Sequence, residues 1–240
     1  MPRFFINETP NEQMIITGED GKHIAKSLRM KVGESLTLCN GQGTDYQCTI
    51  SSIENDQVTV DIERTAPTIS EPTVAVTLYQ GLPKSDKMDS VVQKAVEMGV
   101  TRIVPVLTAR CVSRPDEKSA KKKVERWQKI AMEAAKQSGR GIIPTVAPIA
   151  TFSTAIKQAA AESTALFFYE GGGDSLHQLV NPPCNAYSIF IGPEGGFAEE
   201  EVTLAMEQGA KKATLGPRIL RTETAPVAAL AAIMLSSGNM

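Results

Sequence analysis

Hydrophobic and polar positions alternate in short stretches over the first 64 residues, a pattern typical of strands. The stretches rich in β-branched and aromatic residues are RFFI (3–6), MIIT (14–17), SLTLC (35–39), DYQCTISSI (45–53) and QVTVDIER (57–64). NGQG at 40–43 and END at 54–56 supply hairpin turns. We predict a small β-barrel or sandwich. Within residues 21–34 a short helix interrupts it, and Ile24 and Leu28 share one face of that helix.

The pattern changes after TAPTISEP (65–72), whose two prolines and small polar residues suit a linker. From there on, apolar runs of strand length alternate with helical periodicity, which predicts an α/β domain with a largely parallel sheet. We therefore expect two domains, 1–71 and 72–240. The expected strands are 74–79, 102–108, 165–170, 188–192 and 213–216, and the expected helices are 86–98, 117–138, 198–208 and 223–236.

Three of these helices carry distinctive faces. Apolar residues of 86–98 recur at i, i+3, i+4, i+7 and i+8 from Met88, and Gly99 ends the run, so this helix packs on the sheet. The long helix exposes a basic face that we read as ordinary solvated surface, formed by Lys118, Lys121, Lys122 and Lys123. The last helix, VAALAAIMLSS, is apolar on nearly every side and needs deep burial or a subunit interface. A charge at Ile233 or Met234 is therefore expected to weaken association.

Composition narrows the class of protein. The 240 residues are 42% hydrophobic and 22% charged, as in globular chains. Neither a membrane-spanning run nor a secretory signal is evident, so a cytoplasmic location is expected. Four scattered cysteines and two histidines suggest neither disulfides nor a metal site. The net charge of −2 argues that any RNA contact is local rather than a matter of bulk charge.

Three glycine-rich loops follow expected strands. They read YEGGGD (169–174), GPEGGF (192–197) and GPRILRTE (216–223). In an open parallel sheet, ligands bind at the carboxyl ends of the strands, so these loops are expected to converge on one site. Glycine permits close approach of the backbone, and backbone groups can read a base edge. The chain lacks the common phosphate-binding glycine motifs, so a nucleoside cofactor is favoured.

Four separated segments resemble the bacterial ribosomal RNA small-subunit methyltransferase E family, which methylates N3 of a uridine. They are KMDSVVQKAVEMGV (87–100), RWQKIAMEAAKQSGR (126–140), IGPEGGF (191–197) and LGPRILRTETAP (215–226). The resemblance implies an N-terminal PUA-like RNA-binding barrel and a C-terminal SPOUT domain with a trefoil knot. It also implies S-adenosylmethionine as methyl donor, a homodimer formed through the C-terminal domain, and small-subunit (16S) ribosomal RNA, free or within the assembled 30S subunit, as partner.

The resemblance also assigns residues. The cofactor would lie among Tyr169, Glu170, Ile191, Gly192, Glu194, Gly195, Gly196, Leu215, Gly216, Ile219 and Leu220. In the barrel, Arg3, His23 and Arg29 would meet RNA. Apart from the resemblance, Gln137 and Arg140 lie at the end of the long helix and are expected to contact the target nucleotide.

Methylation at uridine N3 requires that the site favour loss of the N3 proton, because N3 is nucleophilic only after it loses that proton. Arg221 stays protonated, so it can stabilise negative charge on the uracil oxygens but cannot act as the base. Glu223 or Glu194 could take the proton. The sequence does not decide between them.

Other functions remain compatible with the sequence. A non-catalytic RNA-binding or ribosome assembly factor would explain the barrel but would leave the glycine-rich loops without a role. A SPOUT methyltransferase acting on another RNA would use the same loops. A transferase acting on a sugar nucleotide would be expected to show a phosphate loop or a paired-acid metal site, and neither is present.

Overall fold

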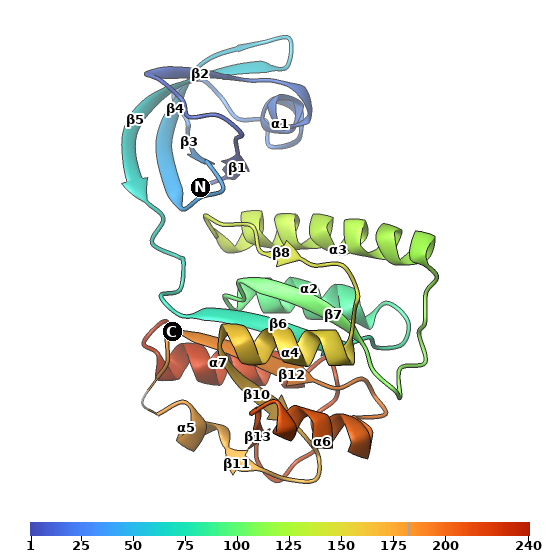
Figure 1. Cartoon of the computed structure of the whole chain (residues 1–240). Coiled ribbons are helices and arrows are strands. Elements are labelled where there is room, and N and C mark those ends of the chain that lie inside the picture. Colours follow the sequence, from blue (N-terminus) through green and yellow to red (C-terminus); the bar gives the residue numbers. More distant parts are fainter. Residues whose placement is uncertain (182) are drawn as a thin grey trace. The chain divides into compact units, whose positions relative to one another are not determined.

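A computed structural model describes residues 1–181 and 183–240. The chain forms two compact units (Figure 1). One comprises Met1–Glu71 and Ala135–Ile143, and the other comprises Pro72–Ala134 and Pro144–Met240. The assignment of residues 1–71 and 72–240 to separate RNA-binding and methyltransferase domains stays a prediction.

The first unit is built on a five-stranded sheet within its described residues, in the order β1-β3-β4-β5-β2. The strands are β1 (Arg3–Phe5), β2 (Gln13–Ile16), β3 (Ser35–Cys39), β4 (Thr44–Glu54) and β5 (Gln57–Pro67). The β4–β5 hairpin turns at Asn55 and Asp56, both with positive φ, as the END sequence predicts. A helix, α1 (Gly18–Lys22), widens into a π-helical turn, η1 (His23–Ser27), and contributes Ile24 to the buried core.

The segment Ala135–Ile143 belongs to the first unit, and a buried ion pair is one of its links there. Arg140 is 2% exposed and donates to both carboxylate oxygens of Glu71, at 3.1 and 2.8 Å. The backbone N–H groups of Gly141 and Ile142 also donate to Glu71. Burial alone would raise the pKa of this carboxyl, but the hydrogen bonds and charge of Arg140 and the two N–H groups outweigh burial and lower it.

The second unit has an eight-stranded sheet in the described part of the chain, and all its paired strands are parallel. The main order is β11-β13-β10-β12-β6-β7-β8, with β9 also paired to β7. The strands are β6 (Ala75–Gly81), β7 (Arg102–Leu107), β8 (Thr145–Val146), β9 (Ala150–Thr151), β10 (Thr164–Phe168), β11 (Asp174–Ser175), β12 (Ala186–Ile191) and β13 (Lys211–Thr214).

Helices cover both faces of this sheet (Figure 1). On one face α4 (Phe152–Glu162) and α6 (Glu199–Glu207) contact each other, and on the other α2 (Lys87–Glu97) contacts α7 (Ala225–Ser236). The remaining helices are α3 (Glu117–Ser138) and the short α5 (Leu176–Leu179). Aromatic rings fill the core under α4, where Tyr79 and Phe190 stack with centroids 4.5 Å apart.

The last helix is covered on one side by its own chain. Ile233 and Met234 are 0% and 3% exposed, so the sequence-based choice of these residues as interface positions was wrong: they pack inside the subunit. Leu235, by contrast, is 67% exposed. No helix in the described residues is long and apolar enough to cross a membrane.

Candidate active site

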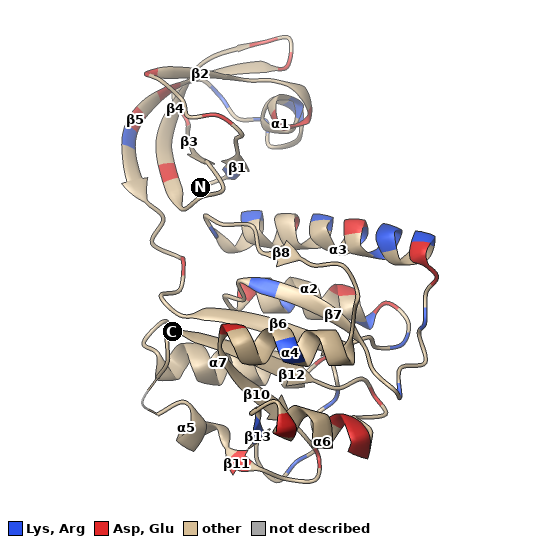
Figure 2. Cartoon of the chain, viewed as in Figure 1, with Lys and Arg blue, Asp and Glu red and all other residues tan. Residues whose placement is uncertain are grey.

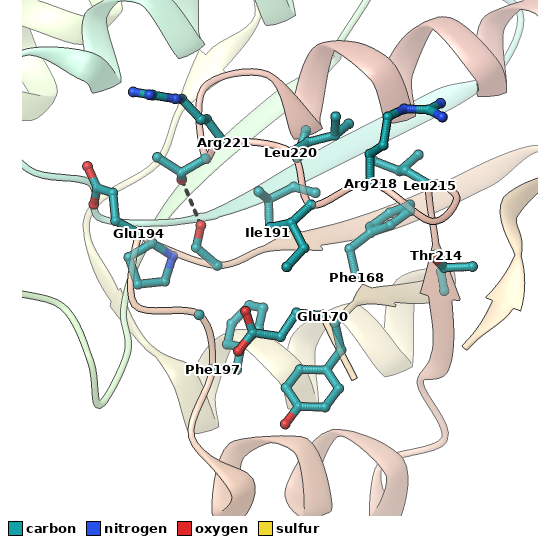
Figure 3. A pocket seen from close by; sticks show the side chains of 18 of the residues that line it. Phe168, Glu170, Ile191, Glu194, Phe197, Thr214, Leu215, Arg218, Leu220 and Arg221 are labelled. Atoms are coloured by element: carbon teal, nitrogen blue, oxygen red, sulfur yellow. Dashed lines mark hydrogen bonds between the residues drawn. The ribbon is translucent and has the colours of Figure 1, made fainter. Parts of the chain in front are cut away.

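A cavity of about 770 Å³ lies in the second unit at the carboxyl ends of β13, β10 and β12, which are neighbours in the sheet. The three loops that follow these strands line it, together with Lys87 and Ala225 from α2 and α7. The expected convergence of the loops is therefore observed. Figure 3 shows Arg221 and Glu194 at one end of the cavity and Arg218 and Thr214 at the other, with Ile191 and Leu220 between them.

Two glycines let the loops take this shape. Gly216 has φ +103°, which strongly disfavours a side chain at that position. Gly196 has φ +66°, and a Cβ there would lie 3.3 Å from a carboxylate oxygen of Glu170. The backbone can thus lie close to whatever occupies the cavity.

A buried polar network ties two of the loops together below the cavity. Thr222 donates its hydroxyl to the Gly192 carbonyl at 2.7 Å and accepts a hydrogen bond from the Gln80 amide at 3.0 Å. Gln80 is completely buried on β6 and also donates to the carbonyl of Gly81. Because Thr222 stands between Arg221 and Glu223, this network fixes the backbone from which both side chains extend.

A charged cluster joins the same loops from the side of α2. Lys87 Nζ lies 2.8 Å from Glu194 Oε1 and 3.5 Å from Glu223 Oε2. The backbone N–H of Lys84 also donates to Glu194. Burial raises the pKa of Glu194, but the hydrogen bonds from Lys87 and the Lys84 N–H outweigh it, so the pKa lies below its ordinary value.

Glu223 differs from Glu194 in one respect. Its Oε2 atom is buried and has no hydrogen-bond partner in the part of the chain that the structure describes. The Lys87 ammonium lies at ion-pair distance from this oxygen, without a hydrogen bond. A buried acceptor without a hydrogen bond is unusual in a folded protein and marks Glu223 for attention.

Comparison with known proteins identifies the family of this chain. An RNA methyltransferase domain model matches residues 70–234, and an RNA methyltransferase PUA domain model matches residues 16–63. Ribosomal RNA small subunit methyltransferase E of Bacillus subtilis is 36% identical over 97% of this chain and 96% of its own. The chain belongs to the ribosomal RNA small subunit methyltransferase E family.

Solved structures agree with this membership. The Neisseria gonorrhoeae member of the family, bound to S-adenosylmethionine, superposes with a TM-score of 0.89 at 35% identity over 98% of this chain and 97% of its own. A Legionella pneumophila methyltransferase with bound S-adenosylmethionine gives 0.86 at 32% identity, over 98% and 97% of the two chains. The predicted fold class, a PUA-like module before an α/β methyltransferase domain with a parallel sheet, is confirmed. The trefoil knot stays a prediction.

Ten of the eleven residues predicted to bind the cofactor line the cavity. They are Tyr169, Glu170, Ile191, Gly192, Glu194, Gly196, Leu215, Gly216, Ile219 and Leu220. Gly195 is not among the lining residues: a Cβ on it would meet Arg110 at 3.2 Å. Of the predicted catalytic residues, Arg221 lines the cavity, and so does Glu194, the alternative base. Glu223 does not line it but lies 3.5 Å from Lys87, which does.

The residues predicted to contact RNA have varied surroundings within the first unit. His23, Arg29 and Gln137 are exposed. Arg3 instead makes a two-pronged ion pair with Asp45, at 2.6 and 2.7 Å, and Arg140 is buried against Glu71. These two pairs give Arg3 and Arg140 a structural role. An RNA contact by any of the five stays a prediction.

Sequence reasoning missed several residues of the site. Phe168, Phe197 and Arg218 line the cavity beside predicted neighbours, and reading each loop in full would have found them. Lys87, Gln80 and Thr222 are different, because the Lys87–Glu194 and Gln80–Thr222 contacts join residues more than 100 positions apart along the chain. No group of three or more His, Cys, Asp or Glu placed to hold a metal ion is found in the described residues.

Proposed function

We propose that this protein transfers a methyl group from S-adenosylmethionine to N3 of a uridine in small-subunit (16S) ribosomal RNA. Two relatives that align over nearly the whole chain hold S-adenosylmethionine. The observation that supports the same cofactor here is the cavity itself, which has a suitable volume, apolar side chains and closely approaching glycine backbone.

The cavity offers distinct surfaces to such a molecule. Ile191, Leu215 and Leu220 provide apolar cover for an adenine ring, and the loop backbone provides N–H and C=O groups for its edge. Glu170 provides a carboxylate that can accept hydrogen bonds from ribose hydroxyls. When bound, S-adenosylmethionine supplies a methyl group on a positively charged sulfur.

The residues of this chain then have two tasks at the uracil ring. Glu223, whose carboxylate lies beside the cavity at ion-pair distance from Lys87, removes the N3 proton. Glu194, whose pKa is lowered by its hydrogen bonds from Lys87 and the Lys84 N–H, holds Lys87 in place. Arg221 donates hydrogen bonds to a uracil oxygen and stabilises the negative charge that develops when the proton leaves.

The test combines binding with product analysis. Isothermal titration should show one S-adenosylmethionine per chain. Incubation with methyl-labelled cofactor and purified small-subunit RNA or 30S subunits, followed by digestion to nucleosides, should give labelled 3-methyluridine. A label on another base, or at another position of uridine, would refute the proposed target atom. Cofactor binding without methyl transfer to either substrate would favour the non-catalytic assembly role.

A further inference from the structure

We infer that a basic strip on the second unit, running from the edge of the active-site cavity along α3, binds phosphates of the substrate RNA. The basic strip consists of Arg110, Arg114, Lys118, Lys121, Lys122 and Lys129. The inference rests on the proposed function for its ligand, an RNA strand whose target uridine occupies the cavity.

The local charge is high for this chain. Residues 110–129 hold eight Lys and Arg against three Asp and Glu, a net charge of +5 in a protein whose net charge is −2. Figure 2 shows Lys and Arg recurring along α3, with Glu between them. Positive charge concentrated on one face of an otherwise acidic chain is the electrostatic pattern of a phosphate-binding surface.

The charge on the strip is not neutralised by the protein. Lys118, Lys121, Lys122 and Lys129 are exposed, and no carboxylate in the described residues lies within ion-pair distance of them. Two other basic residues in this part of α3 are engaged differently: Arg126 pairs with Asp89, and Lys123 lies over the Trp127 ring. The four free lysines therefore remain available to an anion.

The helix dipole does not account for the lysines near the start of α3. Lys118 and Lys121 lie in its first two turns, where the helix dipole disfavours cations. Lys118, Lys122 and Lys129 share one side of the helix at spacings of four and seven residues, and span about 16 Å at 1.5 Å per residue. A row of that length can meet several phosphates of one strand.

The strip begins at the active site. Arg110 donates to the carbonyl of Gly195, in the loop that lines the cavity, at 3.0 Å. Arg114 donates to the carbonyls of Thr108 and Ala109, just after β7. Both guanidinium groups are thus positioned by neutral carbonyls, which do not neutralise their positive charge. An RNA strand leaving the cavity past Gly195 would meet Arg110 first and the lysines of α3 next.

The test uses two triple variants of the full chain with the same change in net charge. The strip variant is Lys118→Gln/Lys122→Gln/Lys129→Gln. The control variant is Lys94→Gln/Lys157→Gln/Lys211→Gln, which changes exposed lysines on α2, α4 and β13. Affinity for protein-free small-subunit RNA is measured from 50 to 300 mM salt, alongside affinity for S-adenosylmethionine and the methyl-transfer rate at saturating RNA.

We expect the strip variant to bind RNA about tenfold more weakly at low salt, with the slope of log affinity against log salt reduced by about 2. The control should match the unmodified protein, and cofactor affinity and the saturated rate should be unchanged in both. Equal weakening in both variants would mean that only bulk charge matters and would overturn the inference. So would an RNA affinity and a salt dependence that are unchanged in the strip variant. If the unmodified protein transfers no methyl group to RNA, the proposed function is wrong. The RNA titration still shows whether the basic strip binds RNA.

Discussion

Arg221 is the residue proposed to stabilise the negative charge that develops on uracil. It lines the cavity and has an exposed side chain, so it is free to reach a base. Its interaction with uracil grows as negative charge develops, so Arg221→Ala should lower the methyl-transfer rate about a hundredfold with little loss of cofactor or RNA affinity. Arg221→Lys should restore only part of the rate, because an ammonium lacks the planar fork of donors. A normal single-turnover rate in Arg221→Ala at saturating ligands would leave Arg221 a positioning role only.

Thr222 is expected to act through its neighbours rather than on the substrate. In Thr222→Val the link to the Gly192 carbonyl is lost and the buried Gln80 amide loses a partner. We expect about a tenfold to hundredfold lower rate, because Arg221 and Glu223 are no longer held in place, and a loss of about 1–3 kcal/mol in the free energy of unfolding. Thr222→Ser, which keeps the hydroxyl, should recover most of the rate.

The matched control is Thr101→Val. Its hydroxyl donates to the Val76 carbonyl at 2.9 Å, in the same sheet but outside the residues lining the cavity. Thermal unfolding and single-turnover rates of both variants separate stability from positioning. If both variants lose stability and neither loses rate, the network below the cavity serves the fold alone.

Among the elements, the end of α3 depends on charge for its attachment to the first unit. The lowered pKa of Glu71 means that its ion pair stabilises the fold fully above the ordinary carboxyl pKa, and that this contribution disappears as the pH falls through the lower folded value. Glu71→Gln should therefore reduce the free energy of unfolding by about 3 kcal/mol at pH 7, since it removes the charged acceptor of the buried Arg140 and of two backbone N–H groups. The difference from the unmodified protein should shrink as the pH is lowered from about 5 towards 2.

Glu63→Gln is the control for this experiment, because Glu63 is an exposed carboxylate on β5 and its substitution changes the net charge equally. Urea unfolding across the pH series would show little effect of that variant. A gap for Glu71→Gln that stays constant with pH would mean that packing, rather than charge, holds the segment.

The sequence predicted most of the elements, and the exceptions have physical reasons. Predicted strands and helices of the second unit coincide with β6, β7, β10, β12, β13 and α2, α3, α6, α7 to within a few residues. Most of these elements carry a clear pattern of apolar positions. The helix α4 went unpredicted, although Thr151 caps it and Phe152, Ala155, Ile156 and Ala159 form its buried face. Its alanine-rich sequence gives weak contrast between apolar and polar sides.

Local irregularity accounts for another difference. Ile24 and Leu28 were expected on one buried face, but Leu28 is 42% exposed. The helix widens into the π-helical turn η1 at His23, and Arg29 has φ +53°, so the spacing of ordinary helical turns no longer holds there. In the active site the three loops were predictable from glycine and proline, whereas the Lys87 cluster and the Gln80 network were not. Those depend on contacts between distant segments, which local patterns do not encode.

For the chain as a whole, the proposed homodimer through the second unit rests on α7. Ala228, Ala231 and Leu235 lie on the side of α7 away from its buried residues, and Leu235 is 67% exposed. Leu235→Glu should place an unpaired charge in the interface and raise the dimer dissociation constant about a hundredfold. Val112→Glu is the control, since Val112 is also an exposed apolar residue, 68% exposed, in the loop after β7. Sedimentation equilibrium should show the control as a dimer, and an unmodified monomer at micromolar concentration would refute the homodimer.

The central claim is that this protein forms 3-methyluridine in small-subunit ribosomal RNA. The most direct measurement is quantitative mapping of that nucleoside in 16S RNA from cells with the gene, without it, and without it but supplied with the Arg221→Ala form. We predict one uridine that is methylated at N3 in the first cells, unmodified in the second, and largely unmodified in the third. The same 3-methyluridine present at full level in cells without the gene would contradict the proposed function.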